Sequence, residues 1–272
     1  MKLKSVLLAS AAVLFAGSAS AADLTSPFFV PSQGKITSDT KVQHSRTHWS
    51  ERYGNFYDSG IDDATVAREE LAYGITNNLA VFGVIGNYFD NEGGYNNSHN
   101  FDYEIGARYN KDFGRIKTQV AGSYYTYDPK SWDGNDYEPE GRGQNDRWQK
   151  YFNGEIKVGV DMCNGLIPYA SYKFSGQVDS SDREFYQSAF LGVHKYAGKW
   201  AADAGIRYDF NTDSRNNNLV YAQAEVDYYA MDNLALGVYG DYKIGGSNVS
   251  SDIYDDDIGT DYTVGLRAKV MF

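Results

Sequence analysis

The sequence predicts an all-β fold, namely a transmembrane antiparallel β-barrel of about 12 strands with short periplasmic turns and long extracellular loops. Three observations predict it. Apolar and polar residues alternate with a period of two in one segment after another, and the connections between these segments alternate in length. A short apolar leader at the N-terminus indicates export from the cytoplasm.

Composition narrows the class of protein further. The chain has 272 residues, with 25 Lys and Arg against 36 Asp and Glu, and a formal net charge of −11. This balance argues against a nucleic-acid partner, because binding phosphates requires cations. Hydrophobic residues make up 42% and aromatic residues 15%, which is too much for a chain that stays unfolded. With 1 Cys, neither an internal disulfide nor a thiolate zinc site is expected.

The first residues have the parts of a secretory signal peptide. Lys2 and Lys4 precede an apolar run at 6–15, and Ala19-Ser20-Ala21 offers small residues for cleavage. The run is too short to span a bilayer comfortably, which argues against an uncleaved anchor. We therefore expect residues 1–22 to be a signal peptide.

Residues 23–34 are expected to form an N-terminal periplasmic segment. They contain the aromatic run Pro27-Phe28-Phe29-Val30-Pro31. This run fits either a periplasmic tail or a plug inside the barrel, and both alternatives stay open. The barrel itself is expected to occupy residues 35–272, in the outer membrane of a Gram-negative cell.

The early strands show both the alternation and one exception to it. In the second of them, apolar Leu71 and Tyr73 alternate with Arg68 and Glu70, as the two faces of a strand require. Glu69 interrupts the apolar face. The strands predicted before residue 91 are 40–49, 65–75 and 79–89, and the faces of the last are not assigned.

Four strands in the middle of the chain have a clear period of two. In the first of them, Tyr103 and Ile105 oppose Glu104 and Arg108. A tilted strand needs about ten residues to cross the hydrocarbon of a membrane, and these segments have roughly that length. They are 101–110, 115–127, 151–160 and 166–177.

The remaining strands continue the pattern to the last residue. Ala222 and Val226, for example, oppose Glu225 and Asp227. The predicted strands are 183–195, whose faces are not assigned, and then 200–210, 220–229, 234–243 and 262–272.

The connections alternate between short and long, as in an outer-membrane barrel, where short turns face the periplasm. The long connections are polar and rich in Asn and Asp. Short turns are predicted at 76–78, 111–114, 161–165, 196–198 and 230–233. Long loops are predicted at 90–99, 128–146, 178–183, 211–218 and 245–258.

A soluble β-sandwich is the alternative fold. Its apolar face would point to a core dominated by large Leu, Ile and Phe, whereas here this face is rich in Ala, Val, Gly and Tyr. Charge also favours the barrel. One Lys or Arg on the lipid side of the bilayer midplane costs about 2–4 kcal/mol, and the apolar faces are nearly free of charge.

The terminal strand carries a resemblance to bacterial outer-membrane β-barrel proteins. A final Phe preceded by alternating apolar residues looks like the signal read by the barrel assembly machinery, here Leu266, Ala268, Val270 and Phe272. Ala268 and Val270 stand where that signal often has an aromatic residue. The resemblance implies insertion by that machinery among outer-membrane lipid and lipopolysaccharide. The strand number is similar to that of small porins, nucleoside channels and outer-membrane phospholipase, without a motif that selects one.

The polar faces would line the interior of the barrel. Besides Asp102, Arg115 and Asp209, the predicted lumen residues are Arg68, Glu70, Glu104, Arg108, Lys117, Glu155, Lys157, Lys173, Asp203, Arg207, Glu225, Asp227, Asp241, Lys243, Arg267 and Lys269.

Two interpretations of these charges stay open. Acidic side chains gather on the last strands while Lys117, Lys157 and Lys173 lie on the middle ones, and opposed charged walls would orient a polar solute. Alternatively, the charges pair and cross-link the interior. A barrel of about 12 strands lies between the filled eight-stranded and the open sixteen-stranded cases.

The expected function is therefore a porin-like channel for passive diffusion of small polar solutes. The alternatives are a non-conducting structural or surface-interaction barrel and, third, a lipid hydrolase. Hydrolysis would need Ser or Thr beside a His, with His99 and His194 as candidates but no motif around them. No cofactor, metal or catalytic residue is predicted.

Other features have an ordinary interpretation. His44 and His48 would share one face of a strand, where metal binding is conceivable but a surface or lumen pair is preferred. The acidic loop 252–257 is interpreted as solvated, although it could bind Ca²⁺ or bridge cations at lipopolysaccharide. Cys163 is expected in a periplasmic turn. These patterns do not indicate an oligomeric state.

Overall fold

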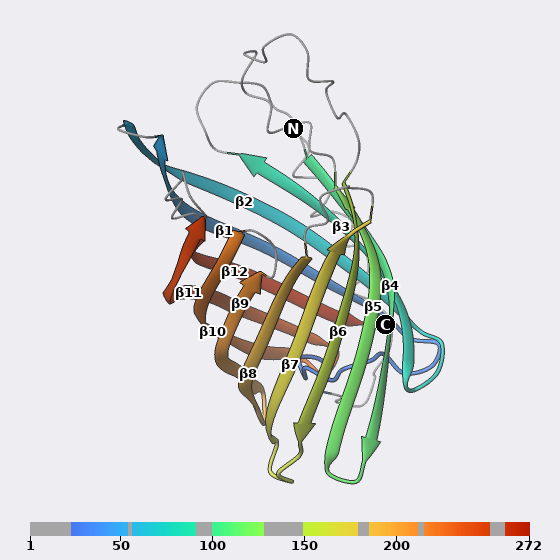
Figure 1. Ribbon diagram of the computed structural model, residues 1–272. Coiled ribbons are helices and arrows are strands. Elements are labelled where there is room, and N and C mark those ends of the chain that lie inside the picture. The colour runs from blue at the N-terminus through green and yellow to red at the C-terminus, as the bar shows by residue number, and fades with distance from the viewer. Residues whose placement is uncertain are drawn as a thin grey trace.

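The described residues of the protein form a closed, all-antiparallel β-barrel (Figure 1). The computed structural model describes residues 23–53, 56–90, 100–127, 149–178, 185–211, 215–250 and 259–272, in which no helix occurs. The signal peptide 1–22 therefore lies outside the described residues, as do His99, the acidic loop 252–257 and most of the predicted long loops.

Twelve strands form the barrel within these ranges, and each pairs with its neighbours in sequence. They are β1 (Ile36–Tyr53), β2 (Phe56–Gly74), β3 (Leu79–Asp90), β4 (Asn100–Phe113), β5 (Ile116–Tyr127), β6 (Gln149–Val160), β7 (Leu166–Gln177), β8 (Phe185–Ala197), β9 (Trp200–Asn211), β10 (Arg215–Met231), β11 (Leu234–Ser250) and β12 (Gly259–Met271).

The first and last strands close the barrel. β1 and β12 pair from Thr37↔Met271 to His48↔Gly259, with one irregularity between Arg46 and Thr47. The amide of Phe272 donates to the carbonyl of Ile36 at 2.8 Å. Closure leaves no sheet edge with unpaired backbone groups, which hydrocarbon cannot satisfy.

The side chains are distributed in the reverse of a soluble sandwich. Ile105, Leu191 and Leu266 are 68%, 70% and 63% exposed on the outside, whereas Asp102 and Asp227 are buried inside. The predicted barrel is confirmed. None of the described segments forms a helix of the length and apolar character needed to cross a membrane.

Four strands are longer than predicted by about seven residues or more. β1, β2, β10 and β11 have 17–19 residues, so the predicted strands at 40–49 and 65–75 were too short and the predicted loops 211–218 and 245–258 are partly strand. The alternation weakens where these strands extend beyond the height of the hydrocarbon, because both faces are polar there. β1 and β2 are joined by residues 54–55 alone, so this connection at the long-loop end is short.

Two glycines at the opposite, short-turn end allow a matched test of turn geometry. Gly165 and Gly198 both have a positive φ, of 75° and 63°. A Cβ at Gly165 would lie 2.3 Å from the carbonyl oxygen of Tyr196, whereas one at Gly198 would meet nothing within 4 Å. Both turns therefore need glycine for their conformation, but only the first needs it for space.

We expect Gly198→Ala to lower the free energy of unfolding by about 1 kcal/mol through backbone strain alone. Gly165→Ala should cost clearly more, since the backbone must also move. Urea titration of the refolded protein, followed by tryptophan fluorescence, measures both. Equal losses would contradict the close approach at Gly165.

Candidate functional site

The inner wall of the barrel carries the predicted lumen residues. Each predicted lumen residue that lies within a strand is on the inner face, as the alternation of side chains and the observed register show. Most of these residues form ion pairs. Arg115 is an exception. It lies exposed in the turn before β5, because the strand begins one residue later than predicted.

One group of charges joins β1, β10 and β12. Arg267 donates to both carboxylate oxygens of Asp39, at 2.8 and 2.5 Å, and also to Glu225. Lys269 lies 4.0 Å from Asp39, and Asp227 is buried on the same wall. Asp39 was not among the predicted lumen residues, because its role follows from the pairing of β1 with β12 and not from any local motif.

A second group joins β2 and β4. Arg68 donates to Asp102 at 2.9 Å, and Arg108 pairs with Glu70. The Arg108 guanidinium also lies 4.5 Å from the centre of the Phe82 ring. These pairs neutralise much of the charge on this wall.

A third group lies on β6 and β7. Glu155 is placed between Lys157 at 3.3 Å and Lys173 at 3.5 Å. Lys157 also reaches the side chain of Gln119, a buried residue that the sequence analysis missed, at 3.4 Å. The side chain of Lys173 is 60% exposed. Glu104, on the neighbouring wall, accepts hydrogen bonds from Ser123 and Asn153.

The remaining predicted residues lie on β9, on β11 and near the short turns. Arg207 pairs with Asp209 at 3.0 Å and with Asp241 at 3.3 Å. The predicted acidic wall is therefore interleaved with arginines. Lys243 lies on the inner face of β11 by alternation. Lys117 pairs with Asp112 and Asp161, at the short-turn end.

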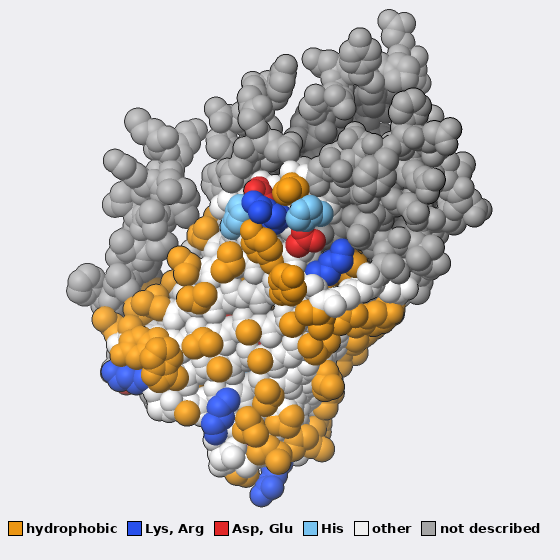
Figure 2. All heavy atoms as spheres, turned by 90° about the vertical axis from the view of Figure 1, so that its left-hand side faces the viewer, with side chains coloured by type: hydrophobic (Ala, Val, Ile, Leu, Met, Phe, Trp, Pro, Cys, Tyr) orange, Lys and Arg blue, Asp and Glu red, His pale blue; other side chains and the backbone are white. Residues whose placement is uncertain are grey.

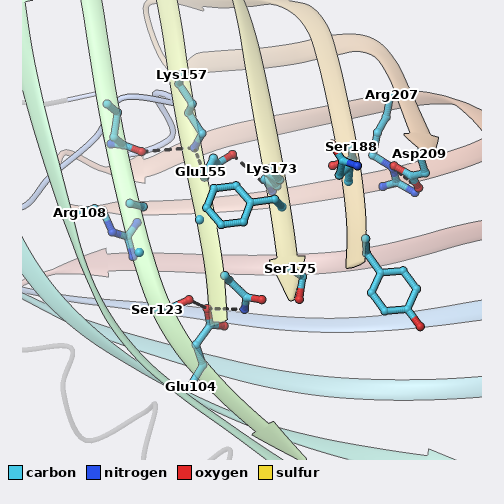
Figure 3. A pocket seen from close by; sticks show the side chains of 18 of the residues that line it. Glu104, Arg108, Ser123, Glu155, Lys157, Lys173, Ser175, Ser188, Arg207 and Asp209 are labelled. Carbon is cyan, nitrogen blue, oxygen red and sulfur yellow. Dashed lines mark hydrogen bonds and ion pairs between the residues drawn. The ribbon is translucent and has the colours of Figure 1, made fainter. Parts of the chain in front are cut away.

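Members of the second and third groups, together with Arg207 and Asp209, line a cavity of about 720 Å³ (Figure 3). Its lining mixes charged side chains with hydroxyl and amide groups and with the apolar Phe82, Phe174, Phe210 and Leu219. Figure 3 shows Glu155 and Lys173 on adjacent strands, and Ser188, Arg207 and Asp209 on the strands beyond them. Such a surface can hydrogen-bond polar solutes without selecting one sign of charge.

The N-terminal segment 23–34 lies inside the barrel end at which the short turns gather, where it is drawn in blue in Figure 1. Leu24 is fully buried against Ala201, Tyr229, Ala235 and Met271. This is the plug arrangement of the two alternatives.

A second contact region holds the middle of the segment. Phe28 is buried against Ile167 and Tyr169. Asn110 donates to the carbonyl of Phe28 at 3.0 Å, and Lys157 donates to that of Pro27 at 3.2 Å. The segment therefore narrows the lumen below the cavity.

Asp23 anchors the start of this segment to the wall. Its carboxylate lies 2.8 Å from Nε2 of His194 and accepts hydrogen bonds from Tyr229 and Thr25. Burial alone would raise the pKa of this carboxyl, but the contacts with His194, Tyr229 and Thr25 hold the pKa below its ordinary value. The carboxylate of Asp23 therefore contributes its stabilisation in full above pH 3.8, and this contribution is lost as the pH falls through the lowered pKa.

Among the described residues, His194, a candidate general base for hydrolysis, contacts carboxylates and not a hydroxyl group. It is 1% exposed, and its two ring nitrogens lie 2.8 Å from Asp23 and 3.6 Å from Asp203. An imidazole between two carboxylates is not paired with a nucleophilic hydroxyl. The sequence alone gave no sign of this bridge, because Asp23 comes from the distant N-terminal segment.

The other candidates lie elsewhere. Cys163 is exposed in the turn between β6 and β7, and His44 and His48 lie on the outer face of β1. Within the described ranges, no group of three His, Cys, Asp or Glu side chains is placed to hold a metal ion.

Comparison with known proteins identifies the fold. No family model and no curated protein sequence matches the chain. Among solved structures, the chain is similar to the COG4313 outer membrane channel from Pseudomonas putida F1, with a TM-score of 0.63 and 11% sequence identity over 91% of this chain and 98% of that one. The chain therefore has the fold of an outer-membrane β-barrel.

Two further solved structures have lower TM-scores against this chain. The β domain of the Bordetella autotransporter BrkA gives a TM-score of 0.49 at 14% identity, over 87% of this chain and 99% of that one. The KdgM porin in complex with disordered oligogalacturonate gives 0.47 at 8% identity, over 85% and 98%. The subfamily of this chain is not identified by these similarities.

The anchoring of the N-terminal segment can be tested by thiol labelling of Leu24→Cys in a Cys163→Ser background. At pH 7 we expect slow labelling, since residue 24 is fully buried. Adding Asp23→Asn should accelerate it about tenfold or more, because a charge-assisted contact worth about 1.5–3 kcal/mol is lost. Asp232→Asn, at an exposed turn residue, is the control and should leave the rate unchanged. Equal rates in all three would show that Asp23 does not hold the segment.

Proposed function

We propose that the protein is an outer-membrane channel for passive diffusion of small polar solutes. The observation that carries this proposal is the cavity of about 720 Å³ inside a closed barrel, whose lining includes charged side chains from several strands. The lining presents charges, hydroxyls and amides beside Phe82, Phe174 and Phe210, and its charged groups, such as Glu155 and Lys173, favour polar solutes over purely hydrophobic ones. The similarity in fold to a protein described as an outer membrane channel supports the same function.

Selection would depend on width and on hydrogen bonding. The N-terminal segment and the ion pairs restrict the interior, so large solutes are excluded. Small solutes exchange their water for the polar side chains of the wall, which lowers the cost of leaving bulk solvent. Lys173 and Asp241, on different walls, would orient solutes that carry charge or a dipole.

The route of the chain to the membrane belongs to the same proposal. Residues 1–22 would direct export and be removed. Leu266, Ala268, Val270 and Phe272 would then be read by the barrel assembly machinery. The outward position of Leu266 on β12, where it is 63% exposed, is compatible with recognition by another protein during assembly.

A non-conducting barrel remains the rival, and the paired charges support it. Arg267 with Asp39 and Glu225, and Arg68 with Asp102, link neighbouring strands and could close the interior together with the N-terminal segment. Such a barrel would act through its loops, as a structural or surface-interaction protein.

Single-channel recording in a planar bilayer separates the two. We expect discrete openings, and persistent silence of folded protein would support the rival. Lys173→Gln should shift the reversal potential towards cation selectivity, and Asp241→Asn towards anion selectivity, because each removes one charge of the wall. Lys199→Gln, in an exposed turn, is the control. Unchanged reversal potentials in both lumen variants would contradict the assigned pathway.

A separate observation favours lipid hydrolysis as a second candidate function. On the outer face, Nδ1 of His44 lies 3.4 Å from the hydroxyl of Thr65, and Nε2 lies 4.0 Å from Asp63. In this arrangement the hydroxyl could attack an ester carbonyl while its proton passes to the imidazole. The imidazolium would give that proton to the departing alcohol as the ester C–O bond breaks, and water would then release the fatty acid from the acylated Thr65. Asp63 is also held by Arg46, which weakens its hold on His44, so the channel remains the conclusion.

Release of fatty acid from phospholipid in mixed micelles tests this second function. If the pair is catalytic, folded wild-type protein hydrolyses lipid and Thr65→Val abolishes the activity. His194→Gln should leave it unchanged, because His194 has no hydroxyl partner and faces the lumen. No hydrolysis by folded wild-type protein would remove this candidate.

A further inference from the structure

A row of polar side chains interrupts the lipid-facing surface of β1 and β2. Within this row, which we call the outer stripe, Ser38 and Thr40 donate hydrogen bonds to the two carboxylate oxygens of Glu69. Towards the long-loop end the stripe continues with His44, Arg46 and Asp63. Strand alternation places these residues on the same face as the exposed Val42 and Leu71.

The depth of Glu69 follows from the register. On the outer face of β12, Phe272 and Tyr262 are about ten residues apart, which in a tilted strand corresponds to about 25 Å, the height of an outer-membrane apolar band. Thr40 pairs with both Ala268 and Glu69. Each step to a neighbouring tilted strand changes the height by about 3 Å, so Glu69 lies about 4–16 Å above the level of Phe272, inside the hydrocarbon.

The upper part of the stripe reaches the level of Tyr262. Arg46 donates to both oxygens of Asp63, at 2.7 and 2.8 Å, and its guanidinium lies 5.9 Å from the Tyr262 ring. His48 pairs with Asp261 just above. Figure 2 shows basic, acidic and His side chains gathered here, directly below the grey region.

The other side of the barrel has no such stripe among its described residues. Ile105 on β4, Val120 on β5, Ile156 on β6, Leu191 on β8 and Ile206 on β9 project outward and are 45–70% exposed. Ionisable groups facing lipid are costly and are found where they have a partner. Among the described residues, a row of ionisable side chains on the lipid-facing surface is therefore specific to β1 and β2. We expect a binding partner to cover it.

We propose that the outer stripe is the contact surface of a symmetric dimer of this chain. Copies inserted in the same orientation are related by an axis along the membrane normal, so every residue meets residues at its own depth. Glu69 would then face the partner subunit at the depth where the hydroxyl groups of its β1 lie. The pair of Arg46 and Asp63 would face the same pair of the second copy. The stripe is complementary to itself in charge and in depth.

The geometry favours a two-fold contact of stripe with stripe. A head-to-tail contact would press Glu69 against the apolar outer face of other strands and leave it unsatisfied. Small neighbours on the same face, Ala67, Gly83 and Ala268, allow two barrels to approach closely. A Cβ at Gly83 would meet one atom, at 3.8 Å, so this surface is open.

A lipid headgroup fits the stripe less well than a second copy does. Glu69 lies below the level at which headgroups are found, and a carboxylate repels phosphate. Arg46 is already held by two hydrogen bonds to Asp63. A protein partner, in contrast, can satisfy groups along the full height of the stripe.

Cysteine cross-linking in isolated outer membranes tests the dimer. Ala67→Cys, in a Cys163→Ser background, should give a disulfide-linked species of twice the chain mass on oxidation. Leu191→Cys is the matched control, because it is 70% exposed on the opposite side of the barrel, and should give none. Equal cross-linking at both sites, or a linked species with a different mass at Ala67→Cys, would overturn the proposal.

The mass of the detergent-solubilised protein provides an independent measurement. We expect a dimer for the wild type and for Glu69→Gln, and a monomer for Glu69→Trp, whose ring would hold the barrels apart. Ile105→Trp, on β4, should remain a dimer. Heat-dependent migration on gels confirms that each variant is folded, so a monomeric wild type would count against the dimer and not against folding. The result is independent of whether the lumen conducts.

Discussion

The structure depends on one constraint: a backbone that crosses hydrocarbon must satisfy all its hydrogen bonds within the protein. Antiparallel pairing satisfies them along each strand, and the pairing of β1 with β12 satisfies those of the two strands that would otherwise be edges. Closure then creates an interior. The charged residues of the strands line this interior, because side chains that alternate with lipid-facing ones must point inward.

The same constraint explains why the fold and the inward faces could be predicted but the pairing of the lumen charges could not. Each strand carries its own period-two signal, so local sequence is enough to find it. The partners of Arg267 and Lys157, by contrast, depend on which strands meet and in which register. Asp39 lies more than 200 residues from Arg267 in the chain. Pairing of this kind has no local signature, so the sequence left two arrangements open, opposed charged walls and paired charges, and the structure shows mostly pairs.

The sequence contains a pattern that predicts the position of the N-terminal segment inside the barrel. Met271 and Ala235 fall on the polar, inward face of their strands, near the short turns, and Ile167 does the same on β7. Apolar side chains that face a water-filled lumen need a cover. Leu24 and Phe28 provide it, and burying each contributes about 1.5–3 kcal/mol. Exceptions to the alternation thus indicate contacts that the regular pattern does not.

Glu69 is the corresponding exception on the outer face, and the two exceptions have a common physical logic. An apolar residue inside the barrel and an acidic residue outside it are each misplaced with respect to their solvent. The first is explained by a segment of the same chain, which the structure contains. The second has only hydroxyl partners from β1 within the described residues, and these leave its outward side in hydrocarbon. A contact that covers this side would therefore complete the stripe, as the N-terminal segment covers the apolar end of the lumen.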